Sequence, residues 1–173
     1  LSTMKFISGM SAKVNATEEF SKEDNFAFGI SVAGSVAALG IVLTGAIYGE
    51  NATSYMMEAV GMLSYGIVGL ILIKVGRLVH DKFALNQIDK IEQIKARNIT
   101  VGIVDAAGVI ATAIVVRAVL IWAHGLDLST FIAIACGFVV SQAMLILVTR
   151  IKEKQYARNN QNDSMQEAFA QGQ

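Results

Sequence analysis

Four long apolar runs limit what this chain can fold into. They cover roughly residues 26–48, 55–79, 99–123 and 129–149. A helix needs about 20 mainly apolar residues to cross the hydrocarbon core of a bilayer, and each run reaches that length. Hydrophobic residues make up 54% of the sequence, above the roughly 45–50% of soluble domains. The sequence therefore predicts an all-α polytopic membrane protein with four transmembrane helices.

A short pattern occurs twice, 73 residues apart, each time at the start of an apolar run. Both copies contain Glu, Asn, Gly and two Ala at matching positions: Glu19, Asn25, Gly29, Ala33 and Ala38, then Glu92, Asn98, Gly102, Ala106 and Ala111. Similarity at a fixed period indicates repeated structural units. Arg77 and Arg150 end the second and fourth runs at the same offset. Each predicted unit is therefore a helical hairpin.

Basic residues are distributed unevenly along the chain. They lie in the N-terminal segment, in the central connection and in the C-terminal tail, with Arg117 as the exception. The short connections 49–54 and 124–128 contain Glu50 and Asp127 but no Lys or Arg. The positive-inside rule then places both termini and the central connection in the cytoplasm. Both hairpins point the same way, which predicts parallel repeats about an axis along the membrane normal.

These patterns divide the chain into five segments. We expect a cytoplasmic N-terminal lead at 1–24, a first membrane hairpin at 25–80, a cytoplasmic amphipathic connection at 81–97, a second hairpin at 98–151 and a cytoplasmic tail at 152–173. In the connection, Leu85, Ile88, Ile91 and Ile94 recur every three residues, which favours an amphipathic helix. The end of the tail is rich in Asn and Gln, and we expect it to be mobile.

The repeated motif resembles the YjfL family, also known as the DUF350 domain. Its marks are a Glu, an Asn after five intervening residues, and small residues at the head of a membrane helix. The stretch 54–122, with Glu92, Asn98 and Gly102, looks like one unit of that family. The resemblance implies a protein of the bacterial inner membrane and implies no activity. No apolar run precedes Glu19 and an extra one follows the second motif, so we expect a fragment or a member shifted in frame.

Asp105 is the clearest candidate for a functional side chain. It lies seven residues inside the third apolar run, about 10 Å along a helix that rises roughly 1.5 Å per residue. An ionisable group at such depth often marks an ion, proton or substrate path. The alternative is a buried ion pair with Lys74, which lies at a similar depth in the second run.

Arg117 is a further charge inside an apolar run. It lies near the predicted outer surface, where its side chain can reach the interface and where Glu58 is a candidate partner. The alternative is a ring of Arg117 side chains around a pore in an oligomer, which would favour anions.

The repeated Asn25 and Asn98 are expected to cap the helices that follow them. If those helix starts are buried, their free N–H groups could instead bind an anion such as phosphate or a lipid headgroup. Small residues spaced by four also form faces that let helices approach closely, either inside the bundle or in a homo-oligomer. These residues are Gly29, Ala33 and Ala37, then Gly102 and Ala106, then Ala133, Gly137 and Ser141.

The remaining features predict no enzyme and no cofactor. The formal net charge is zero, which gives no sign of nucleic-acid binding, and Cys136 is the single cysteine. The sequence shows no nucleophile set, metal cluster or phosphate loop. We expect a non-enzymatic assembly or scaffold component that forms a homo-oligomer or binds another membrane protein. The alternative is a small ion channel or transporter that uses Asp105.

Overall fold

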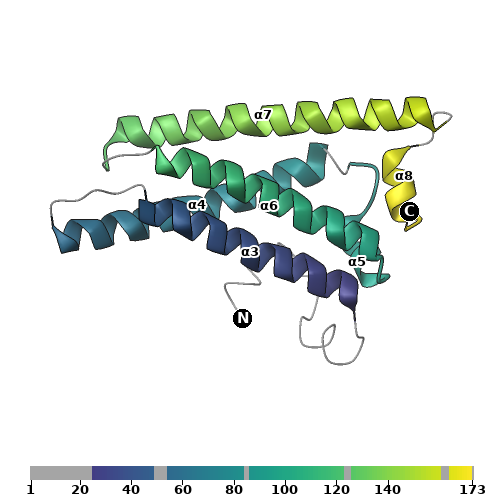
Figure 1. Ribbon diagram of the computed structural model, residues 1–173, viewed down its shortest axis with the longest axis horizontal. Coiled ribbons are helices and arrows are strands. Elements are labelled where there is room, and N and C mark those ends of the chain that lie inside the picture. The colour runs from purple at the N-terminus through teal and green to yellow at the C-terminus, as the bar shows by residue number, and fades with distance from the viewer. Residues whose placement is uncertain (1–24, 49–53, 84–85, 123–125, 161–163, 173) are drawn as a thin grey trace.

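The computed structural model describes residues 25–48, 54–83, 86–122, 126–160 and 164–172, and these are helical apart from short connections (Figure 1). The long helices are α3 (Phe26–Tyr48), α4 (Tyr55–Phe83), α6 (Ile99–Ile121) and α7 (Leu128–Asn159). The short ones are α5 (Lys90–Lys95) and α8 (Met165–Ala170). All four long helices are long and apolar enough to cross a membrane. The predicted all-α membrane protein with four such helices is therefore confirmed.

Helix α3 has the bounds of the first apolar run, whereas α4 and α7 continue past theirs. Helix α7 extends to Asn159 through a charged segment, because backbone hydrogen bonds can continue after the apolar pattern ends. The described part of the tail, which its composition predicts to be mobile, contains the short helix α8. There α8 packs back on the chain, with Gln166 fully buried and its Oε1 accepting from the Gln87 backbone N–H at 2.9 Å.

The predicted helix of the connection is short and lies against the other helices. It shrinks to the six residues of α5, and Asp89 caps it by accepting from the N–H groups of Ile91 and Glu92 at 3.0 and 3.1 Å. Its apolar side packs against the first turns of α3 and α6, where Ile94 is buried beside Phe28. We refer to this part of the molecule as the α5 end.

Helices α3 and α6 form the centre of the fold, and they run parallel. Glycines let them approach closely: a Cβ at Gly34 would lie 2.5 Å from that of Ala106, and a Cβ at Gly102 would lie 2.6 Å from the Ala27 carbonyl oxygen. Near their other ends, Arg117 Nε donates to Thr44 Oγ1 at 3.0 Å. Residues further along α3 contact residues further along α6, so residues about one repeat length apart in the sequence lie side by side.

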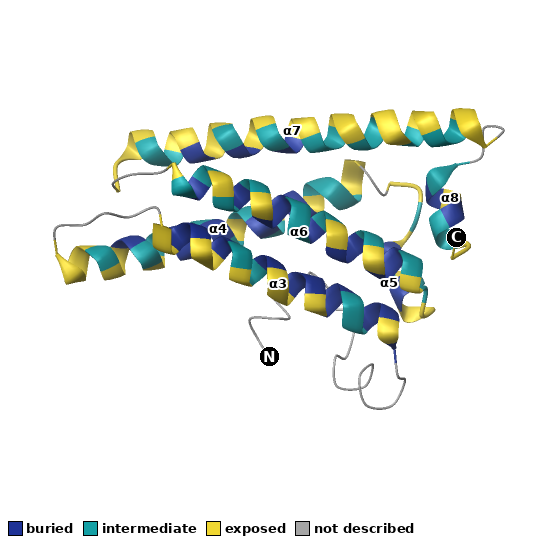
Figure 2. Ribbon diagram, viewed as in Figure 1, coloured by how far each residue is buried: buried dark blue, intermediate teal, exposed yellow. Residues whose placement is uncertain are grey.

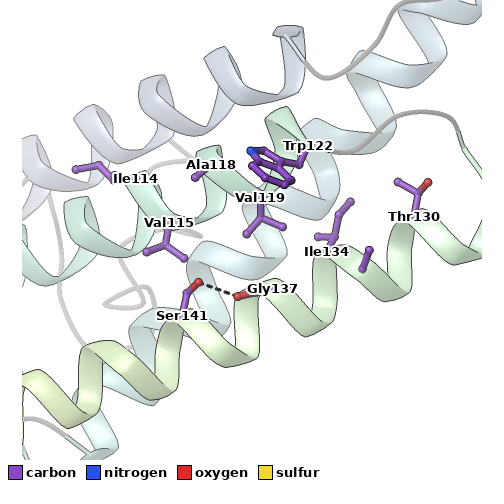
Figure 3. Close-up of a pocket in the computed structure, with 10 residues that line it drawn as sticks. Ile114, Val115, Ala118, Val119, Trp122, Thr130, Ile134, Gly137 and Ser141 are labelled. Carbon is purple, nitrogen blue, oxygen red and sulfur yellow. Dashed lines mark hydrogen bonds between the residues drawn. The ribbon is translucent and has the colours of Figure 1, made fainter.

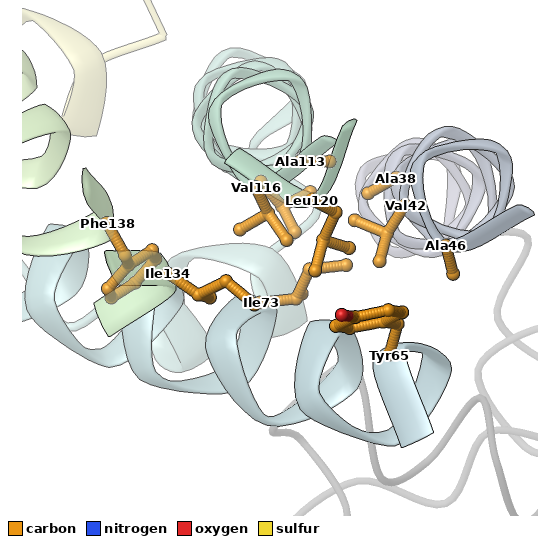
Figure 4. Close-up of a cluster of buried hydrophobic side chains, with 11 residues drawn as sticks. Ala38, Val42, Ala46, Tyr65, Ile73, Ala113, Val116, Leu120, Ile134 and Phe138 are labelled. Atoms are coloured by element: carbon orange, nitrogen blue, oxygen red, sulfur yellow. The ribbon is translucent and has the colours of Figure 1, made fainter. Parts of the chain in front are cut away.

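A buried apolar cluster fills the bundle away from the α5 end (Figure 4). Helix α4 crosses this region and contributes Tyr65 and Ile73, which pack with Val42 of α3 and with Val116 and Leu120 of α6. All five side chains are fully buried. This half of the bundle is therefore a packed apolar core.

Helix α7 lies at the edge of the bundle (Figure 2). Its buried residues are Ile134, Phe138 and Gln142, which follow one another at intervals of four along a single narrow stripe. Most other residues of the helix are exposed, including Val139 and Val140. Their apolar surface is what a lipid-facing helix requires.

The contact at Gly102 gives a stability prediction. Gly102→Ala places a methyl group against the backbone of Ala27, which cannot move aside as a flexible side chain would. Overpacking costs about 1–3 kcal/mol, partly offset by roughly 1 kcal/mol of gained helix propensity. We expect a lower midpoint of thermal unfolding in detergent. The control is Gly40→Ala, since nothing lies within 4 Å of a Cβ there; equal midpoints for the two variants would contradict the close contact.

Candidate functional site

The site is a network of buried charged groups at the α5 end, centred on Asp105 of α6. This residue is 2% exposed. Its Oδ2 accepts hydrogen bonds from Ser31 Oγ and Arg77 Nη2, and its Oδ1 lies 2.9 Å from Lys90 Nζ. Three donors from α3, α4 and α5 therefore converge on one carboxylate of α6.

Arg77 reaches Asp105 because α4 crosses beside both α3 and α6. The guanidinium is buried, and Nη1 donates to Ser35 Oγ at 3.0 Å while Nη2 lies 3.3 Å from Ser31 Oγ. Ser35 in turn donates to the Ser31 carbonyl oxygen at 2.9 Å. The two serines, one helical turn apart, thus provide acceptors for Arg77 within an otherwise apolar helix.

Lys90 links the network to the surface. The Asp89 cap orients the first turn of α5 so that Lys90, its first residue, faces inward. Lys90 Nζ donates to Asp81 of α4 as well as pairing with Asp105. Asp81 is 30% exposed, and His80 Nδ1 lies 4.0 Å from its Oδ1. The polar chain therefore runs from the half-buried His80 and Asp81 to the fully buried Ser31.

The charges within the network balance. Arg77 and Lys90 carry two positive charges, and Asp81 and Asp105 carry two negative ones. Moving a single ion out of water costs several kcal/mol, and only a well-paired arrangement with further hydrogen bonds offsets that cost. Asp105 meets this condition, since both of its oxygens are engaged, and Lys90 pairs with both acids, so the network favours one placement of α3, α4, α5 and α6.

The prediction that Asp105 pairs with Lys74 is corrected by these contacts, since Asp105 binds Arg77 and Lys90. Depth along the helix axis, taken alone, favours Lys74 as the partner. Residues 74 and 77 differ by less than a turn in depth but point in different directions, and burial separates them: Lys74 is half-buried and Arg77 is buried. Arg77 was overlooked because the apolar run ends near it. The pair of serines in α3 was the available signal.

The other predicted charges lie away from this network. Arg117 is half-buried near the opposite end of α6 and binds Thr44, as described above. Glu58 is half-buried in the first turn of α4, and the ion pairs of the described residues do not include one between Arg117 and Glu58. The structure therefore does not bring Glu58 and Arg117 together with Asp105.

Both asparagines of the repeated motif lie at helix starts in capping geometry. Asn25 Oδ1 accepts from the Phe28 N–H at 3.0 Å, and Asn98 Oδ1 accepts from the Val101 N–H at 3.3 Å. Their amide groups also hold neighbouring segments, since Asn25 Nδ2 donates to the Ile94 carbonyl at 2.8 Å and Asn98 Nδ2 donates to that of Phe169 at the same distance. Each asparagine therefore joins a helix start to a second segment.

The rest of the motif has simpler surroundings. Gly29 is half-buried, Gly102 is buried against α3, and Glu92 is exposed on α5. Glu19 lies outside the described residues.

The small residues chosen for helix packing separate into two groups. Ala106 is buried against Gly34, whereas Ala33 and Ala37 are exposed on the far side of α3. On α7, Gly137 and Ser141 are half-buried and Ala133 is exposed. Close packing inside the chain thus uses Gly34 in place of Ala33, one residue further along the helix.

A groove of about 690 Å³ lies between the second half of α6 and the first half of α7 (Figure 3). Its walls include Ile114 and Ala118 of α6 and Ala133, Gly137 and Ser141 of α7. The Ser141 hydroxyl donates to the Gly137 carbonyl at 2.8 Å, so this polar group is already satisfied. The groove is therefore apolar in character, with small side chains along its α7 wall.

Gln142 is a buried polar side chain of a different kind. It is 5% exposed, and its Nε2 has no hydrogen-bond partner among the described residues. The side chain faces the contact between Gly76 and Thr112. Among all the residues that the structure describes, no group of three or more His, Cys, Asp or Glu side chains is placed to hold a metal ion.

Removing the central acid is expected to destabilise the fold strongly. Asp105→Asn leaves the network with one excess buried positive charge, and breaking a buried pair in this way costs about 3–5 kcal/mol. Unfolding in mixed detergent micelles measures this loss. The additional change Lys90→Gln restores neutrality and should recover part of it. Asp127→Asn, at an exposed acid, is the matched control; an equally small effect of Asp105→Asn would contradict the network.

The unsatisfied amide of Gln142 predicts a stabilising substitution. Gln142→Met keeps the side-chain volume nearly unchanged and removes a buried donor whose lack of a partner costs about 1–3 kcal/mol. We expect a higher unfolding midpoint in the same assay. Gln155→Met, on the exposed part of α7, should leave the midpoint unchanged. A loss of stability in Gln142→Met would show that the amide has a hydrogen-bond partner.

Comparison with known proteins identifies the family. No curated protein and no solved structure matches the chain. The model of the family described as Domain of Unknown Function (DUF350) matches residues 1–120, which include α3 to α5 and almost all of α6 but not α7 or α8. The match covers well over half of the 173 residues. It confirms the resemblance carried by the repeated motif, and the chain belongs to the DUF350 family.

Proposed function

We propose that this protein is a non-enzymatic assembly component of the bacterial inner membrane, which forms a homo-oligomer or a complex with another membrane protein. The observation that carries the proposal is that both oxygens of Asp105 are engaged by Ser31, Arg77 and Lys90. A carboxylate held in this way fixes helices together. The exposed apolar faces of α3 and α7 then remain available for other helices.

The proposed orientation has both termini and α5 in the cytoplasm. In its support, Lys82, Lys95 and Arg97 are exposed on the segments next to the pair of Asp81 with Lys90 at the α5 end. The first turn of α4 contains Glu58 instead. Basic residues are enriched on the cytoplasmic side of membrane proteins.

We also propose that α3 and α4 form one hairpin and α6 and α7 form its parallel repeat. The parallel course of α3 and α6 supports this arrangement, because contacts between them join residues separated by about the repeat length. Examples are Ser31 with Asp105 and Thr44 with Arg117.

The alternative function is a small ion channel or transporter that uses Asp105. One observation favours it: polar groups continue from the half-buried Asp81 through Lys90 and Asp105 to Ser35. The apolar cluster of Tyr65, Ile73 and Leu120 occupies the other half of the bundle, however. A path through one chain would require that cluster to open, so the closed network supports assembly better.

Two measurements on the full chain separate these functions. The assembly proposal predicts an oligomer or a co-purifying membrane protein when the chain is extracted in native nanodiscs and weighed by mass spectrometry. It also predicts that wild-type protein leaves the proton and cation permeability of lipid vesicles unchanged. Wild-type flux that disappears in Asp105→Asn, in protein whose helical circular dichroism in the vesicles matches that of wild type, would establish the alternative. A chain that is monomeric, without partner and without flux would contradict both.

A further inference from the structure

Helices α3 and α6 do not use equivalent faces, although they belong to matching positions of the repeat. On α6, one apolar face is buried against α3 and α4: Ala106, Val109, Ala113, Val116 and Leu120, each at most 8% exposed. The residues 73 positions earlier on α3 are all exposed: Ala33, Val36, Gly40, Leu43 and Ile47. We call this set the outer face of α3. The contact between the two helices therefore leaves the outer face of α3 open.

The outer face of α3 retains the chemistry of a packing surface. Its residues follow intervals of three, four, three and four, which is the spacing of a seam between neighbouring helices. It combines small Ala33 and Gly40 with branched Val36, Leu43 and Ile47, as its buried counterpart on α6 combines Ala with Val and Leu. At Gly40 nothing lies within 4 Å of a Cβ. Small residues of this kind let a second helix approach closely within lipid.

The two hairpins also differ in whether another helix packs against them. Helices α3 and α4 together contact α6, the first helix of the next repeat unit along the chain. Helices α6 and α7 occupy the matching positions in the second unit, and the space between them is the apolar groove of about 690 Å³. The α6 wall of that groove includes Ala118. Its repeat counterpart is Gly45 of α3, and Gly45 packs against Arg117 of α6. The first hairpin is therefore occupied by the next helix, whereas the second is open.

We propose that the groove between α6 and α7 receives α3 of a second copy of this chain, through the outer face of that α3. This contact between chains would have the same geometry as the contact between α3 and α6 within one chain. The inference rests on the assembly function proposed above. Within one chain, the buried face of α6 packs against α3 and α4. The outer face of α3 is the repeat counterpart of that α6 face, so α3 of a second copy suits the equivalent place between α6 and α7. All copies share one orientation in the membrane, so α3 would enter parallel to α6, as within the chain.

The interface is heterologous, because the groove of one copy meets the α3 of the next. Such contacts form rings when the rotation between copies closes. Neither surface carries a charge: α3 contains no charged residue, and the groove walls contain none. The helices would thus be held by close packing of small residues, which suits the interior of a bilayer.

Cysteine cross-linking between two tagged copies in native membranes tests the geometry. In a Cys136→Ser background, Gly40→Cys on one copy and Ile114→Cys, on the α6 wall of the groove of the other, should form a disulfide between copies. Gly40→Cys with Ile67→Cys, on the exposed side of α4, should form none. Cross-linking of Gly40→Cys to itself would indicate a symmetric contact between α3 helices and would overturn the proposal, as would the absence of any bond to Ile114→Cys.

A packing test uses matched Ala→Leu changes on α7. Ala133→Leu fills the groove, while Ala143→Leu adds the same volume on an exposed part of the helix outside it. We expect Ala133→Leu to remove most of the oligomer in native nanodiscs and Ala143→Leu to leave it intact. An oligomer unchanged by Ala133→Leu would overturn the groove interface but keep the assembly function, whereas a wild-type monomer without partner would overturn both. A different protein displaced by Ala133→Leu, with no second copy present, would assign the groove to that partner and would also overturn the proposal.

Discussion

The buried carboxylate of Asp105 is the constraint on which the arrangement of the helices depends. In lipid, the hydrophobic effect does not drive one apolar helix against another, so specific contacts must select the partners. Asp105 selects three at once, because Ser31, Arg77 and Lys90 come from three different helices. The short helix α5 belongs to this arrangement, since its Asp89 cap turns Lys90 toward the acid. Ionic pairing therefore determines which helices meet, and the apolar contacts determine how closely.

Glycine then permits the close approach that these charges need. The side chains of Ser31 and Asp105 are short, and they can touch only if the axes of α3 and α6 lie close together. Gly34 and Gly102 remove the side chains that would keep the helices apart. Beyond the charges, Tyr65 and Ile73 of α4 fill the remaining space with apolar surface. The polar and apolar halves of the bundle are thus parts of one packing solution.

Much of the helical framework could be predicted from the sequence, because hydropathy and length report directly on a bilayer. The starts of α3 and α6 were also accessible, since Asn25 and Asn98 cap them. The partner of Asp105 was not, because depth along a helix gives no information on direction around it. The same difficulty led to Ala33 in place of Gly34 as a residue of the close helix contact. Faces depend on how helices rotate against each other, and that follows from tertiary contacts absent from a single sequence.

The position of α7 follows from a difference between the two repeat units. Arg77 of α4 is drawn into the bundle by Asp105 of α6. The equivalent residue of α7 is Arg150, and the position equivalent to Asp105 on α3 is Val32, which offers no charge. Arg150 instead pairs with Glu153 of its own helix, at 2.8 Å. Without that ionic anchor, α7 is held to the bundle by the narrow stripe of Ile134, Phe138 and Gln142, and the apolar groove lies between it and α6.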